Sequence, residues 1–574
     1  MTETTHTTRT CEENHFPSFD AAALFYRYWP ASDTAGEKKA IVLFHRGHEH
    51  GARMAHLVDE LDMPGYAFFA WDARGLGRSP GERGYAENFG VLVKDVDAFV
   101  RHISTTYGIR MDNIAVIAQS VGAVVVSAWV HDYAPQIRCM VLASPAFKVK
   151  LYVPLARPGL ALMQKLRGKF FVNSYVKAKF LTHDQARIAS YDSDPLITRP
   201  IAVNILLGLY DTAERVIADA GAIHVPTQLL ISGADWVVHH PPQHDFFNRL
   251  GSATKEKHVL DGFYHDTLGE KDRQLAVTKV RDFIGRMFAA PQAAPNLIDA
   301  DRHGYVKEEF DRLSQPATSL AARAYWVMSR FWIGVGGKLS AGMRLSVATG
   351  FDSGSTLDYV YRNRSAGVTP FGKLVDRIYL DSIGWRGIRI RKTHLERMLG
   401  RAIDALQASG KRVAITDIAA GHGRYILEAL QGRDAQADSI RLRDYSQINV
   451  DAGRKLIAEK GLQHCAAFDQ GDAFDRQSLA NLQPKPTLAV VSGLYELFPD
   501  NHLIRTSLAG LADAVEAGGY LVYTNQPWHP QLELIARSLT SHRQGQPWVM
   551  RRRTQAEMDQ LVEQAGFEKL DQYA

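Results

Sequence analysis

The sequence is poor in cysteine, nearly balanced in charge and without a long apolar run. Its three cysteines, Cys11, Cys139 and Cys465, lie far apart, which excludes a disulfide framework and a paired-cysteine metal site. The 67 Lys and Arg against 62 Asp and Glu leave a net charge of +5 over 574 residues, too little to indicate nucleic acid as a partner. No apolar stretch approaches about 18 residues, the length of a membrane-spanning helix, and residues 1–17 lack the apolar core of a signal peptide. We therefore expect a cytoplasmic protein without a metal ion.

The chain is too long for one hydrophobic core, since cores stop growing at roughly 250–300 residues. Two separate runs of short apolar segments alternating with amphipathic ones predict two α/β domains, each built on a parallel sheet. Residues 147–222 interrupt the first run with helix formers and aromatics, and residues 289–295 have the composition of a linker. We predict a first domain at residues 1–290, a linker and helical connector at residues 291–385, and a second domain at residues 386–574.

The first domain contains a serine between an apolar strand and a helix of small residues. The segment Ile114-Ala-Val-Ile-Ala-Gln-Ser120-Val-Gly122 has the form of a nucleophile elbow, G-x-S-x-G, with Ala118 at the first glycine position. Small residues are needed there because the serine occupies a strained turn at which strand and helix pack closely. Ser120 is therefore a candidate nucleophile, and Val121 would supply one backbone N–H to an oxyanion.

An acid and a histidine follow in the chain order that such a serine needs, each after an apolar strand. Asp235 ends the segment Gly233-Ala-Asp235, and His265 ends Gly262-Phe-Tyr-His265; the 265 − 235 = 30 positions between them leave room for one helix and one strand. His265 would accept the proton of Ser120, and Asp235 would fix the tautomer of His265. The alternative is that these are ordinary polar residues.

The loop Phe44-His45-Arg46-Gly47-His48-Glu49-His50 makes a family resemblance specific. It is similar to the H-G-x-G-E-H pattern of the monoacylglycerol-lipase-like branch of the α/β-hydrolases, with Arg46 and His48 in place of two glycines. The resemblance implies an N-terminal α/β-hydrolase fold and a second oxyanion N–H from Gly47. It also implies a helical lid at about residues 147–222 and a lipid-like or small carboxylic ester as substrate.

Two segments suggest metal sites by composition but lack the required ligands. His45, His48 and His50 have neither a fourth ligand nor the usual separation for zinc. Residues 299–310 begin like a calcium loop, but Phe310 stands where a bidentate glutamate belongs. We expect a polar turn there that caps the next helix.

A helical region is predicted at residues 314–353, with Trp326, Phe331, Trp332 and scattered basic residues. Such a segment is either a packed helix between the domains or a helix at a membrane surface.

The second domain contains a buried strand, an acid and a glycine turn, Val413-Ala-Ile-Thr-Asp417-Ile-Ala-Ala-Gly421-His-Gly423. Ile426 replaces the third glycine of a dinucleotide fingerprint, and no G-K-[ST] of a phosphate-binding loop follows. An acid before the turn suits a ligand with a positive amino group and no pyrophosphate.

This turn resembles motif one of class I S-adenosylmethionine-dependent methyltransferases, [DE]-x-G-x-G-x-G, with Ala419 at the first glycine position. The resemblance implies a Rossmann-like domain and S-adenosylmethionine as cofactor. Further cofactor-binding residues would follow the next strands, with Asp444 at the ribose, Asp472 near the adenine and Ser492 beside the methyl acceptor. Each acid has helix capping as its alternative role. The segment at Ser492 lacks N-P-P-[YFW], which disfavours DNA as acceptor, and a final antiparallel strand is missing, which indicates truncation or an unusual sheet edge.

The whole chain resembles a bacterial fusion of an α/β-hydrolase with a class I methyltransferase. It predicts a bifunctional enzyme that cleaves an ester and methylates an unknown acceptor. Two alternatives remain open. Either only one domain is catalytic and the other is a binding or regulatory module, or the protein contacts the inner face of the membrane peripherally.

Overall fold

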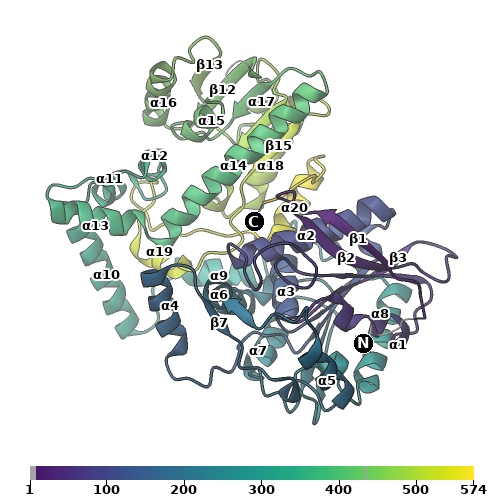
Figure 1. Ribbon diagram of the computed structural model, residues 1–574. Coiled ribbons are helices and arrows are strands. Elements are labelled where there is room, and N and C mark those ends of the chain that lie inside the picture. The colour runs from purple at the N-terminus through teal and green to yellow at the C-terminus, as the bar shows by residue number, and fades with distance from the viewer. Residues whose placement is uncertain (1–7, 292, 433–435, 574) are drawn as a thin grey trace. The chain divides into compact units, whose positions relative to one another are not determined.

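The computed structural model describes residues 8–291, 293–432 and 436–573, and the chain divides into two compact units. Unit 1 runs to Pro295, and unit 2 runs from Asn296 to Tyr573. Each unit has its own sheet and its own hydrophobic core (Figure 1).

Unit 1 is built on an eight-stranded sheet of order β1-β2-β4-β3-β5-β6-β9-β10. Strands β3 to β10 of this sheet are parallel, whereas β1 and β2 form an antiparallel hairpin that pairs with β4. The predicted α/β-hydrolase fold is confirmed, but the sheet is mixed rather than purely parallel. The strands are β1 (Glu12–Pro17), β2 (Ala23–Trp29), β3 (Lys39–Phe44), β4 (Tyr66–Trp71), β5 (Ile114–Gln119), β6 (Cys139–Ala143), β9 (Thr227–Ser232) and β10 (Lys255–Leu260).

Helices cover both faces of this sheet because apolar side chains project from both sides of the central strands. On one face pack α2 (Phe89–Tyr107) and α3 (Val121–Tyr133), and on the other pack α1 (Leu57–Glu60) and α8 (Gln274–Ala289). Helix α2 begins where the Asn88 side chain accepts a hydrogen bond from Val91 N, and it ends at the left-handed Gly108.

The segment between β6 and β9 lies outside the large sheet. It contains α4 (Ala156–Arg167), α5 (Gln185–Ser193) and α6 (Val203–Ala218), and its own short hairpin of β7 (Phe171–Asn173) and β8 (Pro200–Ala202). Helix α6 packs against α3 in the core, whereas α4 has no buried residue and exposes Leu155 at its start and Leu162 and Leu166 within it.

Unit 2 contains five parallel strands in the order β13-β12-β11-β14-β15, which confirms the Rossmann-like prediction. Within the described residues, this sheet has no antiparallel strand after β15. The strands are β11 (Ala414–Asp417), β12 (Ser439–Asp444), β13 (Ala466–Gln470), β14 (Leu488–Val491) and β15 (Tyr520–Tyr523). The helices that accompany them are α14 (Ile383–Ala408), α15 (Arg424–Ala429), α16 (Gln447–Glu459), α17 (Arg476–Ala480), α18 (Asn501–Ala514), α19 (Leu532–Ser538) and α20 (Gln555–Gln564).

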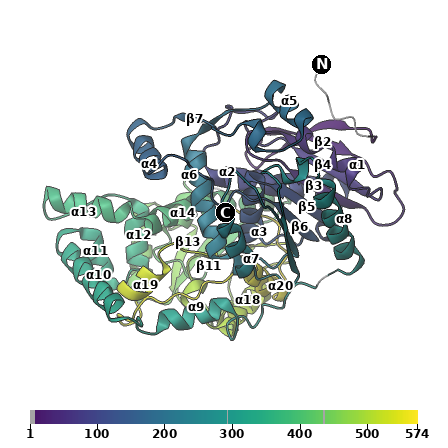
Figure 2. The ribbon, with the colours of Figure 1, turned by 90° about the horizontal axis from the view of Figure 1, so that it is seen from below.

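A group of helices precedes this sheet within unit 2, and α10, α11 and α12 follow one another side by side (Figure 2). The group has five helices, and in four of them the side-chain oxygen of a Ser or Thr caps the N-terminus. Of the helices in the described part of the chain, none is long and apolar enough to span a bilayer. The five are α9 (Tyr305–Ser314), α10 (Leu320–Leu339), α11 (Ala341–Thr349), α12 (Gly354–Arg362) and α13 (Pro370–Leu380).

The calcium-like segment is a turn before α9, but it does not cap that helix with a side chain. The N-cap is Gly304, and Asp301 instead accepts a hydrogen bond from Asn501 N at 2.9 Å. The capping prediction was therefore wrong at this position, because the acid binds another part of unit 2.

Candidate functional sites

Ser120 lies at the sharp turn between β5 and α3. Its backbone has φ 55° and ψ −117°, a conformation that costs a non-glycine residue free energy and is retained where the surrounding structure enforces it. A Cβ on Gly122 would overlap the carbonyl oxygen of His45, so glycine is required two residues after the serine. The strained turn holds the Ser120 side chain at the end of β5.

Three side chains from different parts of unit 1 form a hydrogen-bonded chain. Ser120 Oγ lies 2.7 Å from His265 Nε2, and His265 Nδ1 lies 2.7 Å from Asp235 Oδ2. The other Asp235 oxygen accepts from the N–H groups of Val237 and Val238. Burial alone would raise the pKa of the Asp235 carboxyl, but the charge and hydrogen bond of His265 and these two N–H groups hold that pKa below its ordinary value. The predicted serine, acid and histidine are thus brought together.

Gly47 and Val121 lie side by side near Ser120. A Cβ added to Gly47 would lie 2.9 Å from Val121 Cγ2, which explains why this loop position has no side chain. Neither backbone N–H donates a hydrogen bond to any other residue in the described part of unit 1. Two such unpaired N–H groups beside a serine are what an oxyanion requires.

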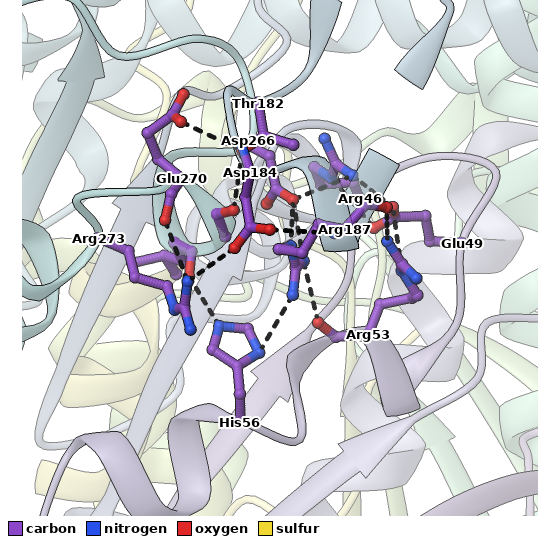
Figure 3. Close-up of polar contacts among 12 residues, drawn as sticks. Arg46, Glu49, Arg53, His56, Thr182, Asp184, Arg187, Asp266, Glu270 and Arg273 are labelled. Atoms are coloured by element: carbon purple, nitrogen blue, oxygen red, sulfur yellow. Dashed lines mark hydrogen bonds and ion pairs between the residues drawn. The ribbon is translucent and has the colours of Figure 1, made fainter. Parts of the chain in front are cut away.

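A largely buried network of charged side chains includes Asp266, the chain neighbour of His265 (Figure 3). Arg46 forms an ion pair with Glu49 and lies 3.5 Å from Asp266, which accepts at 2.9 Å from Arg187 of α5. Burial opposes ionisation of Asp266, but the charges of Arg187 and Arg46 hold its pKa far below the ordinary range. The arginine that replaces a family glycine is therefore part of this network.

Gln119 connects this network to the catalytic candidates. Its side-chain amide donates to Asp266 Oδ1 at 3.1 Å and to the carbonyl of His265 at 3.2 Å. Residues next to the serine and next to the histidine are thus bonded to each other. Sequence reasoning did not single out Gln119, Arg187 or Asp266, although the adjacency of Asp266 to His265 was a usable signal.

The three histidines of the loop after β3 each bond elsewhere rather than to a common point. The hydrogen-bonded pairs are His45 Nε2 and Ala73 N, His48 Nδ1 and Thr198 O, and His50 Nε2 and Asp194 Oδ2. These contacts give each imidazole a structural role in fixing the loop.

In unit 2, β11 leads into a turn that needs glycine at two positions. Gly421 has φ 58° and Gly423 has φ 73°, both in the left-handed region. A Cβ on Gly423 would also overlap Leu442 Cδ1 of β12. Helix α15 begins at the next residue, so the backbone approaches β12 closely just before the helix.

Asp417 at the end of β11 is fully buried. Its carboxyl accepts from Ala419 N at 3.1 Å and from the Tyr425 hydroxyl. Burial raises the pKa of this carboxyl to about 7, although both hydrogen bonds act in the opposite direction. The Asp417 side chain therefore holds the glycine turn in place through its hydrogen bonds to residues on either side of the two glycines.

The other predicted residues lie at the carboxyl edge of the same sheet. Asp444 accepts from Gly421 N at 2.9 Å, so it contacts the glycine turn directly. Asp472 is exposed just after β13, and its carboxyl accepts from Phe474 N. Ser492 follows β14 and is buried, and its Oγ has no hydrogen-bond partner among the described residues. Ala419 lies between β11 and the two glycines.

Two further charged residues at this edge were missed by sequence reasoning. Arg391 of α14 donates to Glu496 at 3.2 Å, and a Cβ on Gly493 would lie 2.9 Å from Arg391 Nη2. Arg391 Nε and Glu496 Oε2 are buried and lack partners within the described residues. Together with Ser492 Oγ, these unsatisfied atoms fit a polar ligand that carries both positive and negative groups, as the amino-acid part of S-adenosylmethionine does.

These features define the class of protein: an α/β-hydrolase joined to a Rossmann-like domain with a glycine turn. The model of the family described as "Serine aminopeptidase, S33" matches residues 35–272. The model of the family described as "Putative methyltransferase" matches residues 280–574, just over half of the chain. The chain belongs to this methyltransferase family. It is a fusion of two domains: an S33-type, monoglyceride-lipase-like α/β-hydrolase domain and the domain that the methyltransferase family model matches.

Among particular proteins, the chain is 57% identical over 562 residues to "Uncharacterized protein YnbC" of Escherichia coli K12, covering 98% of this chain and 96% of that protein. It is 25% identical to a monoacylglycerol lipase of Mycolicibacterium smegmatis, over 48% of this chain and 97% of the lipase. A solved monoacylglycerol lipase of Paleococcus ferrophilus is 19% identical, with a TM-score of 0.41, over 49% of this chain and all of that one.

Proposed function

We propose that the chain is a bifunctional enzyme, a serine ester hydrolase and an S-adenosylmethionine-dependent methyltransferase. We assign hydrolysis to residues 1–290, with residues 147–222 as the lid, and methyl transfer to residues 386–574. Residues 291–385 would be the connector. A cytoplasmic location fits this assignment.

The hydrogen-bonded chain from Ser120 through His265 to Asp235 supports the hydrolase half. As Ser120 Oγ attacks the ester carbonyl, His265 Nε2 takes its proton, and the N–H groups of Gly47 and Val121 stabilise the oxyanion. His265 then gives the proton to the leaving alcohol, which departs and leaves an acyl-enzyme. A water molecule, deprotonated by His265, attacks the acyl carbon and releases the carboxylic acid with free Ser120.

A lipid-like or other small carboxylic ester is the proposed substrate. Two observations support it: the lipase relatives of this unit, and the apolar side chains that α4 exposes. A fluorophosphonate probe tests the nucleophile. It should label the wild-type chain and the Ser127→Ala variant, in which a buried serine of α3 is removed, but not Ser120→Ala. Equal labelling of all three would refute the assignment.

For the methyltransferase half, the family and the unsatisfied polar atoms at the carboxyl edge of the sheet support S-adenosylmethionine as the cofactor. Gly421 and Gly423 would let the backbone approach it, Asp444 and Asp472 would bind its ribose and adenine, and Ser492 would lie near the acceptor. Ala419 and Asp417 would shape the turn. The cofactor would supply an electrophilic methyl group to an acceptor other than nucleic acid.

Calorimetric titration of S-adenosylmethionine into the full chain tests this half. Asp444→Ala should weaken binding about tenfold or more, because the ribose hydroxyls lose a charged acceptor. The exposed Asp438, which immediately precedes β12 and so lies away from its carboxyl end, provides the control, since Asp438→Ala should leave the affinity unchanged. Absence of heat with the wild-type chain would instead favour the alternative in which unit 2 only binds or regulates.

A peripheral membrane contact is supported by one surface, which we call the connector face. It consists of exposed apolar side chains of α10 and α13, namely Leu320, Tyr325, Met328, Phe331, Trp332, Phe371, Leu374 and Ile378. From Leu313 to Phe351 the sequence has no acid and four basic residues, so an anionic lipid surface fits it best. Flotation with phosphatidylglycerol vesicles should enrich the wild-type chain and not Phe331→Asp/Trp332→Asp. Equal recovery of both would exclude this contact.

A further inference from the structure

Unit 2 contains a cavity of about 730 Å³ that none of the site residues above lines. Its walls come from α9, α10, α19 and the segments 497–499 and 541–549. This volume lies within the range of roughly 300–1,000 Å³ that small-molecule sites occupy.

The cavity wall carries a clear excess of positive charge. Four arginines contribute to it, Arg323, Arg330, Arg537 and Arg543, against the single acid Asp352. Asp352 is already bonded, accepting from the Ser541 hydroxyl and from His542 N, each at 2.6 Å.

Three of the four guanidinium groups form no ion pair with a carboxylate of the described residues, and the fourth forms only a long one. In the described part of unit 2, Arg323, Arg330 and Arg543 form no ion pair within 4.0 Å, and the Arg537 contact with Glu533 is 3.9 Å long. These side chains donate instead to backbone carbonyls, for example Arg543 to Leu497 O and Arg330 to Arg537 O. The wall therefore retains its positive charge, which an anion would compensate.

The remainder of the wall is mostly apolar and aromatic. It includes Leu313, Trp326, Leu497 and Val549, together with Trp548, whose Nε1 is buried and has no partner among the described residues. An unpaired indole N–H beside arginines is a further donor for an anionic group, and the apolar side chains would enclose a chain or ring.

One residue of the cavity wall is two positions away in sequence from a residue that lies close to the glycine turn. Asp352 lines the cavity, and Gly354, two residues further on, lies 3.4 Å from the position that a Cβ of Gly421 would take. Two residues span at most about 7 Å of chain. The cavity also includes Leu497 and Pro499, which closely follow Ser492 along the loop from β14. It therefore lies beside the edge where the cofactor would bind.

We propose that this cavity binds an amphiphilic organic anion, a carboxylate or a phosphate monoester attached to an apolar chain or ring. Its place beside the glycine turn makes this anion the methyl acceptor, a step that rests on the proposed function of unit 2. A carboxylate or phosphate oxygen of the anion would form the new O–CH3 bond as the methyl–sulfur bond of S-adenosylmethionine breaks, and S-adenosylhomocysteine would leave. Two sources supply this chemistry: the carboxylic acid that ester hydrolysis in unit 1 releases, and a lysophosphatidate, whose headgroup is a phosphate monoester.

The test is hydrogen–deuterium exchange of the full chain with dodecanoate, dodecyl phosphate and, as the neutral comparison, dodecanol. Exchange is followed in peptides that cover residues 320–330 and 536–549, so binding in unit 1 does not interfere. Both anions should slow exchange there in a saturable manner. A preference for dodecanoate assigns the hydrolysis product as the source, and a preference for dodecyl phosphate assigns the phosphate headgroup. Equal protection by dodecanol would overturn the proposal.

Charge reversal on α10 provides the decisive variants. Arg323→Glu/Arg330→Glu should weaken anion binding about tenfold or more, whereas Arg323→Lys/Arg330→Lys should retain most of it. Lys338→Glu/Arg344→Glu, the same change of charge at exposed positions outside the cavity, should leave the affinity unchanged. Equal weakening by both charge reversals would overturn the assignment to the cavity.

Salt dependence tests the wild-type chain without any variant. Anion affinity should fall as the ionic strength rises, and an affinity independent of salt would contradict the role of the arginines. All of these experiments are done without S-adenosylmethionine. If the anions bind while S-adenosylmethionine does not, the cavity assignment is retained and the proposed methyl transfer fails.

Discussion

The two candidate sites of this chain are organised in opposite ways. In unit 1, Ser120, His265 and Asp235 bond to one another, and each step of the chain is 2.7 Å long. In unit 2, Asp417 and Asp444 both bond to the glycine turn that follows β11, while Ser492 Oγ and Arg391 Nε have no partner among the described residues.

This difference is what the functions proposed for the two sites require. A nucleophile and its base act on each other, so their geometry can be complete before a substrate arrives. A cofactor site completes its hydrogen bonds only with the cofactor, so the protein supplies a rigid turn and leaves donors and acceptors unsatisfied. The four predictions below test this contrast, from the largest expected effect to the smallest.

Removal of the nucleophile should abolish the chemistry of unit 1 alone. Ser120→Ala should lower kcat for ester hydrolysis by roughly 10³–10⁶-fold, as for other serine hydrolases that lose this group. The affinity for S-adenosylmethionine should not change. Steady-state kinetics and calorimetry measure the two, with Ser127→Ala as the matched serine variant; weakened cofactor binding in Ser120→Ala would show that the two sites are coupled.

Asp266→Asn should destabilise unit 1 by about 3–5 kcal/mol at pH 7, because it leaves Arg46 and Arg187 buried without their shared charge partner. The pKa of Asp266 is depressed in the folded chain, so its contribution is present above the unfolded value near 4 and is lost as the pH falls below that value. The stability difference should therefore shrink in acid.

Urea titrations of the full chain at pH 7 and at pH 3, with hydrogen exchange assigned to unit 1 peptides, measure this difference. The exposed Asp261 provides the control, and Asp261→Asn should cost little. A constant difference at both pH values would argue against the ion-pair explanation.

Asp417→Asn should have the opposite effect in unit 2: it should raise the stability of that unit rather than lower it. The folded chain holds the Asp417 proton with a pKa of about 7, so the wild-type unit loses stability as the pH rises from about 4 to 7. Asparagine has no charge to bury, so at pH 8 the free energy of unfolding of the variant should exceed that of the wild-type chain by up to about 4 kcal/mol. No gain should occur at pH 4. Thermal unfolding at both pH values measures it, and the exposed Asp472 gives a control variant without gain.

Gly47→Ala should slow hydrolysis by about 10²-fold, because the added methyl group meets Val121 Cγ2 and displaces an oxyanion donor. A Cβ at Gly65 has open space, so Gly65→Ala should keep nearly full kcat. If Gly47→Ala raised KM and left kcat intact, the oxyanion role of this N–H would be wrong.

Much of both folds could be predicted from local patterns. Runs such as Ala40–Phe44 and Val413–Ile418 are apolar because their strands are buried on both faces, and the structure has strands there. The edge hairpin was missed because β1 reads Glu-Glu-Asn-His-Phe-Pro and buries only one side chain fully.

For the sites, chain order was informative where the chemistry needs a fixed order of residue types. Ser120, Asp235 and His265 could be proposed in this way. The pairs Gln119–Asp266 and Arg391–Glu496 could not, because each joins residues more than 100 positions apart and neither belongs to a local motif.

One consequence follows from the hydrogen bonds between Arg187, Asp266 and Gln119. Arg187 belongs to α5, in the segment that we propose as the lid, whereas Gln119 and Asp266 are the chain neighbours of the nucleophile and of its base. The Asp266 carboxylate therefore connects α5, in the proposed lid, to the neighbours of the two residues proposed for the proton transfer. A substitution in α5 would alter the turnover number without ever touching the ester.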